Sequence, residues 1–394
     1  MSSMSGSIPA STSRAGRPEA MAVTDFAPSR AKLPGLRLPA LGAIQRRRLD
    51  NFKRNRRGLW SLRLFLALFV ASLFAEVIAN DRPLLISFRG DWKSPLLSFV
   101  SEQDLGGFFG TEADFRAPYT QCLIRTGGND DLCFDDESAP APEGVSPGWI
   151  LWPPIPFSYD TINYDVDRAP SPPDATNLLG TDDQARDVLA RVIYGFRLSV
   201  FFAFIVTATS SIIGVVAGAV QGFFGGWTDL IAQRFIEVWT NIPSLYIIMI
   251  VSSVIAPNFW IMVFLVSLFS WTALVGVVRA EFLRARNFEY VMSARALGVS
   301  NAVIMFRHLL PNAMVATITM LPFLVTAGVS TLAALDLLGF GLQSTHPSLG
   351  ELALQGRNNV QAPWLGITAF FTFAIMLSLL VFIFEAVRDA STRG

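Results

Sequence analysis

Residues 365–387 read LGITAFFTFAIMLSLLVFIFEAV, with Glu385 as the single charged residue. A helix crosses the hydrocarbon core of a membrane with about 20 mostly apolar residues. Open sheet or loop cannot cross there, because lipid offers no partner to unpaired backbone groups. The stretch therefore predicts a membrane-spanning helix.

Five further apolar blocks of similar length precede it. They are residues 59–79, 198–223, 235–256, 259–279 and 313–335. Together the six blocks predict an all-α polytopic membrane protein with six transmembrane helices. The pattern is weakest at 59–79 and 235–256, because Arg63 and Glu237 lie near the ends of these blocks.

The overall composition excludes several classes of protein. Charged residues make up 16% of the chain and hydrophobic residues 52%, whereas soluble domains carry about 25% charged residues. A net charge of zero leaves no excess of basic residues for nucleic-acid phosphates. The only lysines are Lys32, Lys53 and Lys93, and none follows a glycine, so a phosphate-binding loop of the GxxxxGK[ST] type is missing. Two His and two Cys leave little for a metal centre.

The positions of the basic residues predict the topology. A basic cluster lies directly upstream of the first block, and such clusters stay in the cytoplasm. Its members are Arg46, Arg47, Arg48, Lys53, Arg54, Arg56 and Arg57. We interpret residues 1–58 as a disordered basic cytoplasmic tail, and 59–79 as a retained anchor rather than a signal peptide, because no clean small-x-small cleavage site follows. With six spans, residues 281–312 and a tail at 389–394 are then also cytoplasmic.

Residues 80–190 then form a periplasmic insertion of about 110 residues between the first and second spans. The insertion holds 19 Asp and Glu against 7 Lys and Arg, and prolines are frequent in it. We expect an irregular lobe with little regular structure. It contains Cys122 and Cys133. A disulfide between them, which would contribute about 2–3 kcal/mol, and two free thiols are equally compatible with this spacing.

The second block carries a stripe of small residues, each four positions from the next: Ser210, Gly214, Gly218 and Gly222. Small residues at this spacing lie on one helix face and let another helix approach closely in lipid. Two interpretations stay open. The stripe packs against a helix of the same chain, or it meets a partner subunit across a translocation path.

The cytoplasmic segment 281–312 predicts two short helices joined at a glycine. Residues 289–297 form the first helix, and Gly298 ends it. Ser300 can cap the second helix, which Pro311 ends. The pair carries small residues and basic residues at Ser293, Ala294, Arg295, Ala296, Arg307 and His308. Such a pair either docks in a groove of another protein or is a membrane-surface loop whose arginines follow the positive-inside rule.

The letters of this segment resemble a known family. SARALGVS at 293–300, followed by RHLLPN at 307–312, is similar to the cytoplasmic loop of ABC importer permeases, which has the pattern EAA-x3-G-x9-I-x-L-P. Aligned on Gly298, the matching residues are Ala294, Gly298, Leu310 and Pro311, and the departures are Met292, Ser293 and His308. The forms Arg-Ala-Leu-Gly and Arg-His-Leu-Leu-Pro-Asn resemble the dipeptide and oligopeptide branch of these permeases.

Three more stretches resemble the same branch. They are LGTD at 179–182 with RDVL at 186–189 and GFRLS at 195–199, GGW at 225–227 with Asp229 and Arg234, and DLLGFGL at 336–342 with PSLG at 347–350. Ala185 departs from the branch, which has Gly before Arg-Asp. This variant, the enlarged lobe and NVQAPWLG at 359–366 resemble the C-type permease subunit of Yej-type importers of microcin C and oligopeptides.

The resemblance implies a five-helix permease core at 191–388, in a bacterial inner membrane, with no catalytic activity and no bound cofactor of its own. It also implies a second permease subunit, ATP-binding cassette subunits that use ATP and Mg²⁺, and a periplasmic peptide-binding protein. The loop at 281–312 would couple the permease to the ATPase. The residues expected to do so are Glu289, Ser293, Ala294, Arg295, Gly298, Arg307, His308, Leu310 and Pro311.

Other functions fit the residues less well. An ion-gradient-driven secondary transporter or channel is the chief alternative, but that class shows internal repeats or charged, broken helices at mid-membrane. An enzyme is disfavoured because HExxH does not occur and no candidate nucleophile has a neighbouring base in the sequence. Weaker candidates for contact with substrate or with the binding protein are Glu237, Asn241, Asp336, Asp160, Asp165 and Asp167.

Overall fold

The computed structural model describes residues 43–392 of the chain. Most of the predicted disordered tail, 1–42, lies outside the described residues. The rest of that tail is helical, because it forms α1 (Ala43–Arg54) and the start of α2 (Arg56–Leu73). Arginine, which occupies six of residues 43–58, is a good helix former. The prediction of disorder is therefore wrong for residues 43–58.

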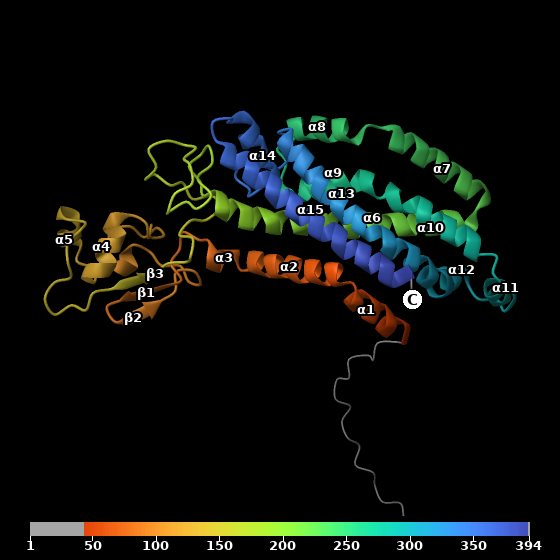
Figure 1. The fold of residues 1–394 in the computed structure, drawn as a ribbon, viewed down its shortest axis with the longest axis horizontal. Coiled ribbons are helices and arrows are strands. Elements are labelled where there is room, and N and C mark those ends of the chain that lie inside the picture. The colour runs from red at the N-terminus through yellow and green to blue at the C-terminus, as the bar shows by residue number, and fades with distance from the viewer. Residues whose placement is uncertain (1–42, 393–394) are drawn as a thin grey trace, which may run out of the picture. The chain divides into compact units, whose positions relative to one another are not determined.

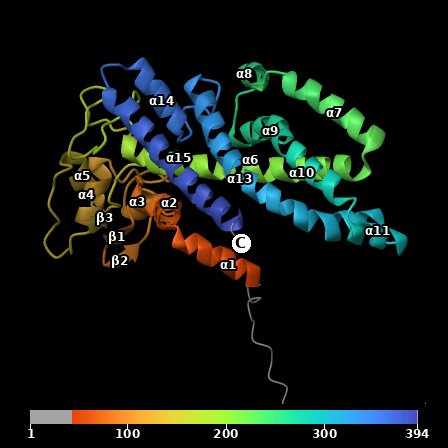
Figure 2. The same ribbon diagram turned by 45° about the vertical axis from the view of Figure 1, so that its right-hand side comes forward.

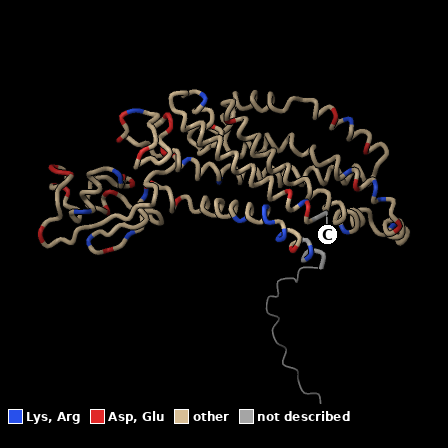
Figure 3. The backbone as a smooth tube through the Cα atoms, in the orientation of Figure 1, with Lys and Arg blue, Asp and Glu red and all other residues tan. Residues whose placement is uncertain are grey.

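Three helices among residues 43–392 are long and apolar enough to cross a membrane (Figure 1). They are α6 (Val188–Phe224), the helical run Asn301–Leu337 that contains α13 (Leu310–Leu337), and α15 (Pro363–Thr392). They cover the predicted blocks at 198–223, 313–335 and 365–387. Because α15 continues through Thr392, most of the segment predicted as a tail at 389–394 is helical. Figure 3 shows few charged residues along the middle of these helices.

The blocks predicted as single helices at 235–256 and 259–279 are bent pairs instead. Helices α7 (Gly226–Asn241) and α8 (Ser244–Val254) meet at an angle of 65°, and α9 (Phe259–Ser270) and α10 (Thr272–Ala285) meet at 41°. Counting each pair as one span raises the number of spans among the described residues to at most five.

Local chemistry explains both bends. Pro243 lacks a backbone N–H and disfavours helix in the residue before it, so Ile242 is extended with φ −73° and ψ 122°. At the second bend, the carbonyl of Leu268 accepts hydrogen bonds from the indole N–H groups of Trp239 and Trp271, at 3.2 and 2.9 Å. Side-chain donors that enter the backbone ladder in this way are a common cause of helix bends.

The first predicted span, 59–79, is also interrupted. Helix α2 ends at Leu73, and the short helix α3 (Ala75–Ile78) follows Phe74. With Arg56, Arg57 and Arg63 in its 18 residues, α2 is not among the helices apolar enough to span a membrane by itself. The described chain is therefore a mostly helical, multi-span membrane protein, and the count of six spans stays a prediction.

Helix α6 is central, with α10 and α13 as its main neighbours (Figures 1 and 2). Its small-residue stripe faces α10. A Cβ added at Gly214 would lie 2.5 Å from the carbonyl oxygen of Trp271, and one added at Gly222 would lie 2.5 Å from the Cβ of Phe282. Real Cβ atoms do not approach so closely, so these glycines permit close helix packing within the chain. The first interpretation of the stripe therefore describes this structure.

The lobe between α3 and α6 has more regular structure than expected. Strands β1 (Leu85–Phe88), β2 (Asp91–Lys93) and β3 (Trp149–Leu151) form an antiparallel sheet in the order β2-β1-β3. Helices α4 (Pro118–Thr126) and α5 (Asp130–Asp135) complete a separate hydrophobic core. The expectations of an all-α chain and of an irregular lobe are therefore too narrow. Strands of three or four residues are too short for an alternating pattern to be recognised in the sequence.

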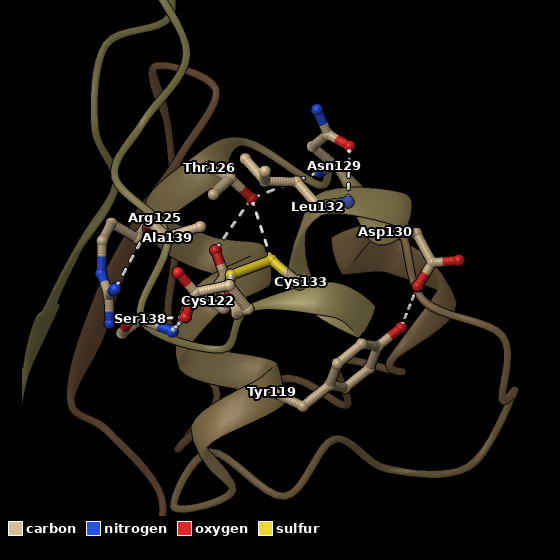
Figure 4. The surroundings of a disulfide bond; sticks show 11 residues. Tyr119, Cys122, Arg125, Thr126, Asn129, Asp130, Leu132, Cys133, Ser138 and Ala139 are labelled. Atoms are coloured by element: carbon tan, nitrogen blue, oxygen red, sulfur yellow. Dashed lines mark hydrogen bonds between the residues drawn. A yellow bond between two sulfur atoms is a disulfide. The ribbon is translucent and has the colours of Figure 1, made fainter.

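A disulfide joins α4 to α5 inside this core (Figure 4). The Cα atoms of Cys122 and Cys133 are 5.6 Å apart, and both side chains are fully buried. The hydroxyl of Thr126 donates to the carbonyl oxygen of Cys122 at 2.9 Å and lies 3.4 Å from the Cys133 sulfur. Of the two possibilities left open by the sequence, the structure contains the bridge.

Candidate functional site

The segment 289–311 connects α10 to α13 and is called the hairpin below. It begins with α11 (Glu289–Ala296), as the sequence predicts. Gly298 adopts φ +77°, in the left-handed region that glycine favours. The N–H of Gly298 donates to the carbonyl of Arg295, and the N–H of Val299 donates to that of Ala294. These two bonds are a Schellman motif, which ends α11 and turns the chain.

The second half of the hairpin differs from the prediction. After α12 (Asn301–Val303), a π-helical turn at Ile304–Leu309 leads without a break into α13. Pro311 therefore lies in the first turn of α13 and does not end a helix. The wider turn accommodates a proline ring that would otherwise press on the carbonyl four residues earlier. Ser300 stands at the N-cap position of α12, but its side chain makes no capping hydrogen bond.

The inner face of the hairpin packs on the ends of two long helices. Val291 and Ala294 from α11 and Ile304 from the π-turn are buried against Phe223 of α6 and Phe282 of α10. The burial of Val291 and Ile304, at about 1.5–3 kcal/mol each, is enough to hold the hairpin in one orientation. Figure 2 shows α11 beside the end of α10.

The outer face carries large apolar side chains exposed to solvent. Leu297 is 83% exposed, Phe306 58% and Met292 53%. Two further members complete what we call the outer apolar surface: Tyr290 and Val303. Sequence reasoning missed these residues and expected small side chains to form the contact face. Ala294 instead points inward, while Ser293 and Ala296 are exposed. The helical period could have identified them. Val291 and Ala294 are three positions apart and share one helix face, so Met292 and Leu297 do not lie on that face.

The polar residues predicted for the site are distributed around this surface. Glu289 is exposed in the first turn of α11, and its carbonyl accepts from the hydroxyl of Ser293 at 2.8 Å. The guanidinium of Arg295 lies 5.0 Å from the centre of the Phe223 ring, which ties α11 to α6. Arg307 and Pro311 are exposed, whereas His308 and Leu310 are half-buried.

A second cluster lies at the other end of α6. Asp182, Arg186, Arg191 and Glu351, here called the buried ion network, connect the segment before α6 to α14 (Leu349–Asn358). Arg186 Nε donates to Asp182 Oδ2 at 2.7 Å, and Arg191 Nη2 donates to Glu351 Oε2 at 2.9 Å. All four residues are buried. Burial raises the pKa of Glu351, and Arg191 and Arg186 oppose that rise.

Two residues near this network, Ala185 and Asp336, have clear structural roles. Ala185 adopts φ +59°, which accounts for the glycine that the family pattern has there. Asp336 is buried, and its carboxylate accepts from the backbone N–H of Leu342 at 2.7 Å and from the hydroxyl of Ser348. A Cβ added at Gly341 would collide with that carboxylate. Asp336 therefore closes the turn that DLLGFGL forms with PSLG.

Comparisons with known proteins identify relatives of this chain. Residues 192–394 match the family described as the binding-protein-dependent transport system inner membrane component. The chain is 49% identical over 377 residues to the peptidoglycan transport system permease protein YejE of Agrobacterium fabrum, covering 89% of this chain and 93% of that protein. It is 51% identical over 351 residues to the inner membrane ABC transporter permease protein YejE of Escherichia coli K12, covering 89% and 97%. The oligopeptide transport system permease protein OppC of Lactococcus lactis subsp. cremoris is 31% identical over 59% of this chain and 80% of its own length.

Proposed function

Because the chain belongs to the family of binding-protein-dependent transport system inner membrane components, we propose that its hairpin transmits the work of ATP hydrolysis to the membrane helices. The chain is a permease subunit of an ABC peptide importer of the Yej type, in the inner membrane. Permease subunits of this family are not themselves catalytic. The proposal concerns how this subunit is driven, and which partners drive it.

The partners follow from the type of transporter. A second permease subunit forms the translocation path with this one, and a periplasmic binding protein delivers the peptide. Two ATPase subunits bind ATP and Mg²⁺ at the cytoplasmic face, which agrees with the missing phosphate-binding loop in this chain. Oligopeptides or peptide-like compounds are the cargo, and microcin C is one candidate from the likeness to Yej-type permeases.

The topology that serves this function has six spans. Helices α2 and α3 together form the first, and each bent pair forms one. The basic residues before α2 and the arginines of the hairpin favour a cytoplasmic location for both. The lobe then lies in the periplasm, where its disulfide is stable, and the C-terminus lies in the cytoplasm.

One observation carries the proposal: the outer apolar surface is attached rigidly to a membrane helix. The π-turn runs directly into α13, and the hairpin core rests on α6 and α10. An ATPase groove binds Leu297 and Phe306. When that groove moves, the hairpin moves with it as a rigid body. Tightly packed helices respond by switching between discrete arrangements, because their packing does not deform continuously.

The turn at Gly298 provides a sharp test. Proline fixes φ near −65° and removes the N–H that closes the Schellman motif, so Gly298→Pro should misorient the outer apolar surface. We expect ATP hydrolysis stimulated by binding protein and peptide to fall about tenfold or more in the assembled complex. Gly298→Asn is the matched control, since asparagine tolerates the left-handed region and keeps the N–H. Equal stimulation in the proline variant and the wild type, with all subunits present, would contradict the proposal.

A further inference from the structure

An open cavity of about 1000 Å³ lies between the lobe and the helical base. Its floor comes from the helices, with Glu76 of α3 and Tyr194 and Arg197 of α6. Its walls come from two lobe segments, 112–118 and 158–165. Binding pockets for small ligands have volumes of about 300–1000 Å³, so this cavity has room for a few amino-acid residues.

The charges that line the cavity do not balance. Every lining arginine is already paired with a carboxylate: Arg82 with Glu112 at 2.7 Å, Arg116 with Asp165 at 3.6 Å, and Arg197 with Glu76 at 2.9 Å. Three more carboxylates line the cavity, and within residues 43–392 none of them has an ion-pair partner: Asp81, Asp114 and Asp160. The lining therefore carries three uncompensated negative charges.

The local hydrogen bonds leave these carboxylates available. Asp81 accepts from the hydroxyl of Thr161 at 2.9 Å, and Asp114 accepts from the backbone N–H of Arg116 at 2.9 Å. Each carboxylate has two oxygens and about four acceptor sites, so both retain free acceptor capacity. Burial first, and then the carboxylate of Asp160, raises the pKa of Tyr159 in the same wall.

The cavity also offers apolar and aromatic surface next to the acids. Tyr164 is 86% exposed and Ile162 is 42% exposed, and both line the cavity along with Leu96. The three arginine–carboxylate pairs add charged hydrogen-bond donors and acceptors. Polar groups that fix orientation beside apolar surface that takes side chains are the features of a site for a peptide.

We propose that this cavity binds the cationic end of a short peptide, with the α-ammonium or a basic side chain among Asp81, Asp114 and Asp160. This inference rests on the proposed function, because it assigns to the lobe a receiving site for the importer's own class of cargo. The site is formed by this chain alone, at the periplasmic side in the proposed topology. It would hold a peptide near the membrane after release from the binding protein.

The test uses the assembled importer in lipid nanodiscs, without binding protein and without ATP. Calorimetric titration compares Lys-Ala-Ala, Ala-Ala-Ala and N-acetyl-Ala-Ala-Ala, which carry two, one and no cationic groups at the N-terminal end. We expect affinity to fall in that order, and to weaken with added salt because the site is open to solvent. Equal affinity for the three peptides would overturn the proposal.

Variants locate the binding. Asp114→Asn combined with Asp160→Asn keeps the shape and one acceptor at each position, and should weaken Lys-Ala-Ala binding about tenfold. The matched control is Asp91→Asn combined with Asp135→Asn, which removes two exposed lobe carboxylates outside the cavity. Binding that is insensitive to the cavity pair, or equally sensitive to both pairs, places the peptide elsewhere and overturns the inference.

Two further measurements separate the possible failures. Peptide import into vesicles that contain the wild-type complex tests the proposed function by itself. If import proceeds but no free peptide binds the lobe, the receiving site is wrong and the importer stands. If the cavity pair impairs only the association with the binding protein, a loop of that protein occupies the cavity, and the proposal of a free peptide is overturned.

Discussion

The hairpin and the buried ion network lie at opposite ends of α6, and they are stabilised by different interactions. The hairpin rests on aliphatic and aromatic contacts and leaves Leu297 almost fully exposed. The network has every side chain buried and ties α6 to α14 through charges. One end therefore leaves apolar side chains exposed, while the charges of the other end are buried within the chain.

This difference has a physical consequence for how the subunit can move. A buried ion pair is costly to break, because each separated charge would stay in a low-dielectric interior. Apolar contacts can be exchanged for similar contacts with a partner at little net cost. In the proposed importer, the network is the fixed end of α6 and the hairpin is the driven end. Substitutions at the two ends should accordingly affect different measurements.

The largest effect should come from removing one charge of the network. Arg191→Met leaves Glu351 buried without its 2.9 Å partner, and we expect a loss of about 3–5 kcal/mol in the free energy of unfolding. Thermal or urea unfolding of the purified subunit complex measures this loss. Adding Glu351→Met in the same chain removes the uncompensated charge and should restore part of the stability. A loss of less than about 1 kcal/mol in the single variant would contradict the assigned role of the network.

A smaller effect is expected where α6 meets α10, between the two ends. A Cβ at Gly218 would lie 2.8 Å from the carbonyl oxygen of Val275, so Gly218→Leu must separate the helices. Overpacking of this kind costs about 1–3 kcal/mol. Gly276→Leu is the matched control. It makes the same substitution in α10, but no atom lies within 4 Å of a Cβ added at Gly276. Equal stability of the two variants would show that α6 and α10 are not in tight contact.

Ala185 offers a gain instead of a loss. Its φ of +59° strains an alanine and suits a glycine, so Ala185→Gly should raise the free energy of unfolding by about 0.5–1 kcal/mol. The opposite sign is expected for Ala353→Gly in α14, since glycine lowers the stability of a helix interior by about that amount. A loss of stability in Ala185→Gly would mean that the segment before the network has another backbone conformation.

The apolar blocks, α11 and the turn at Gly298 could be predicted from the sequence, because each depends on neighbouring residues only. The bend at Pro243 depends equally on neighbours and could have been predicted from Ile242-Pro243. The pairing of Arg191 with Glu351 could not, since 160 positions separate the two residues. The π-turn before Pro311 could not be predicted either. A proline at this position is compatible with the end of one helix or with the first turn of the next.

The same reasoning explains why the burial of Ala294 was not predicted. Small side chains in SARA suggested a face for close docking, but Ala294 packs on the hairpin core. Which face of a short helix is buried depends on Phe223 and Phe282, which arrive from distant helices. Glu289 and Gly298, whose roles depend on local backbone chemistry, were placed correctly in the secondary structure.

A substitution in the hairpin, the driven end, should have the smallest effect on stability and a clear effect on partner binding. Leu297 is 83% exposed, so Leu297→Ser removes little buried surface and should change the free energy of unfolding by less than about 0.5 kcal/mol. If the side chain enters an ATPase groove, its burial there contributes about 1.5–3 kcal/mol, and its loss should weaken binding of the ATPase subunits about 10- to 100-fold. Biolayer interferometry on nanodisc-embedded permease measures this affinity. Phe134→Ser, at a residue 80% exposed on the lobe, is the control that should leave it unchanged. Equal affinities for both variants would remove the hairpin from the ATPase interface, and the contrast between a fixed and a driven end of α6 would no longer hold.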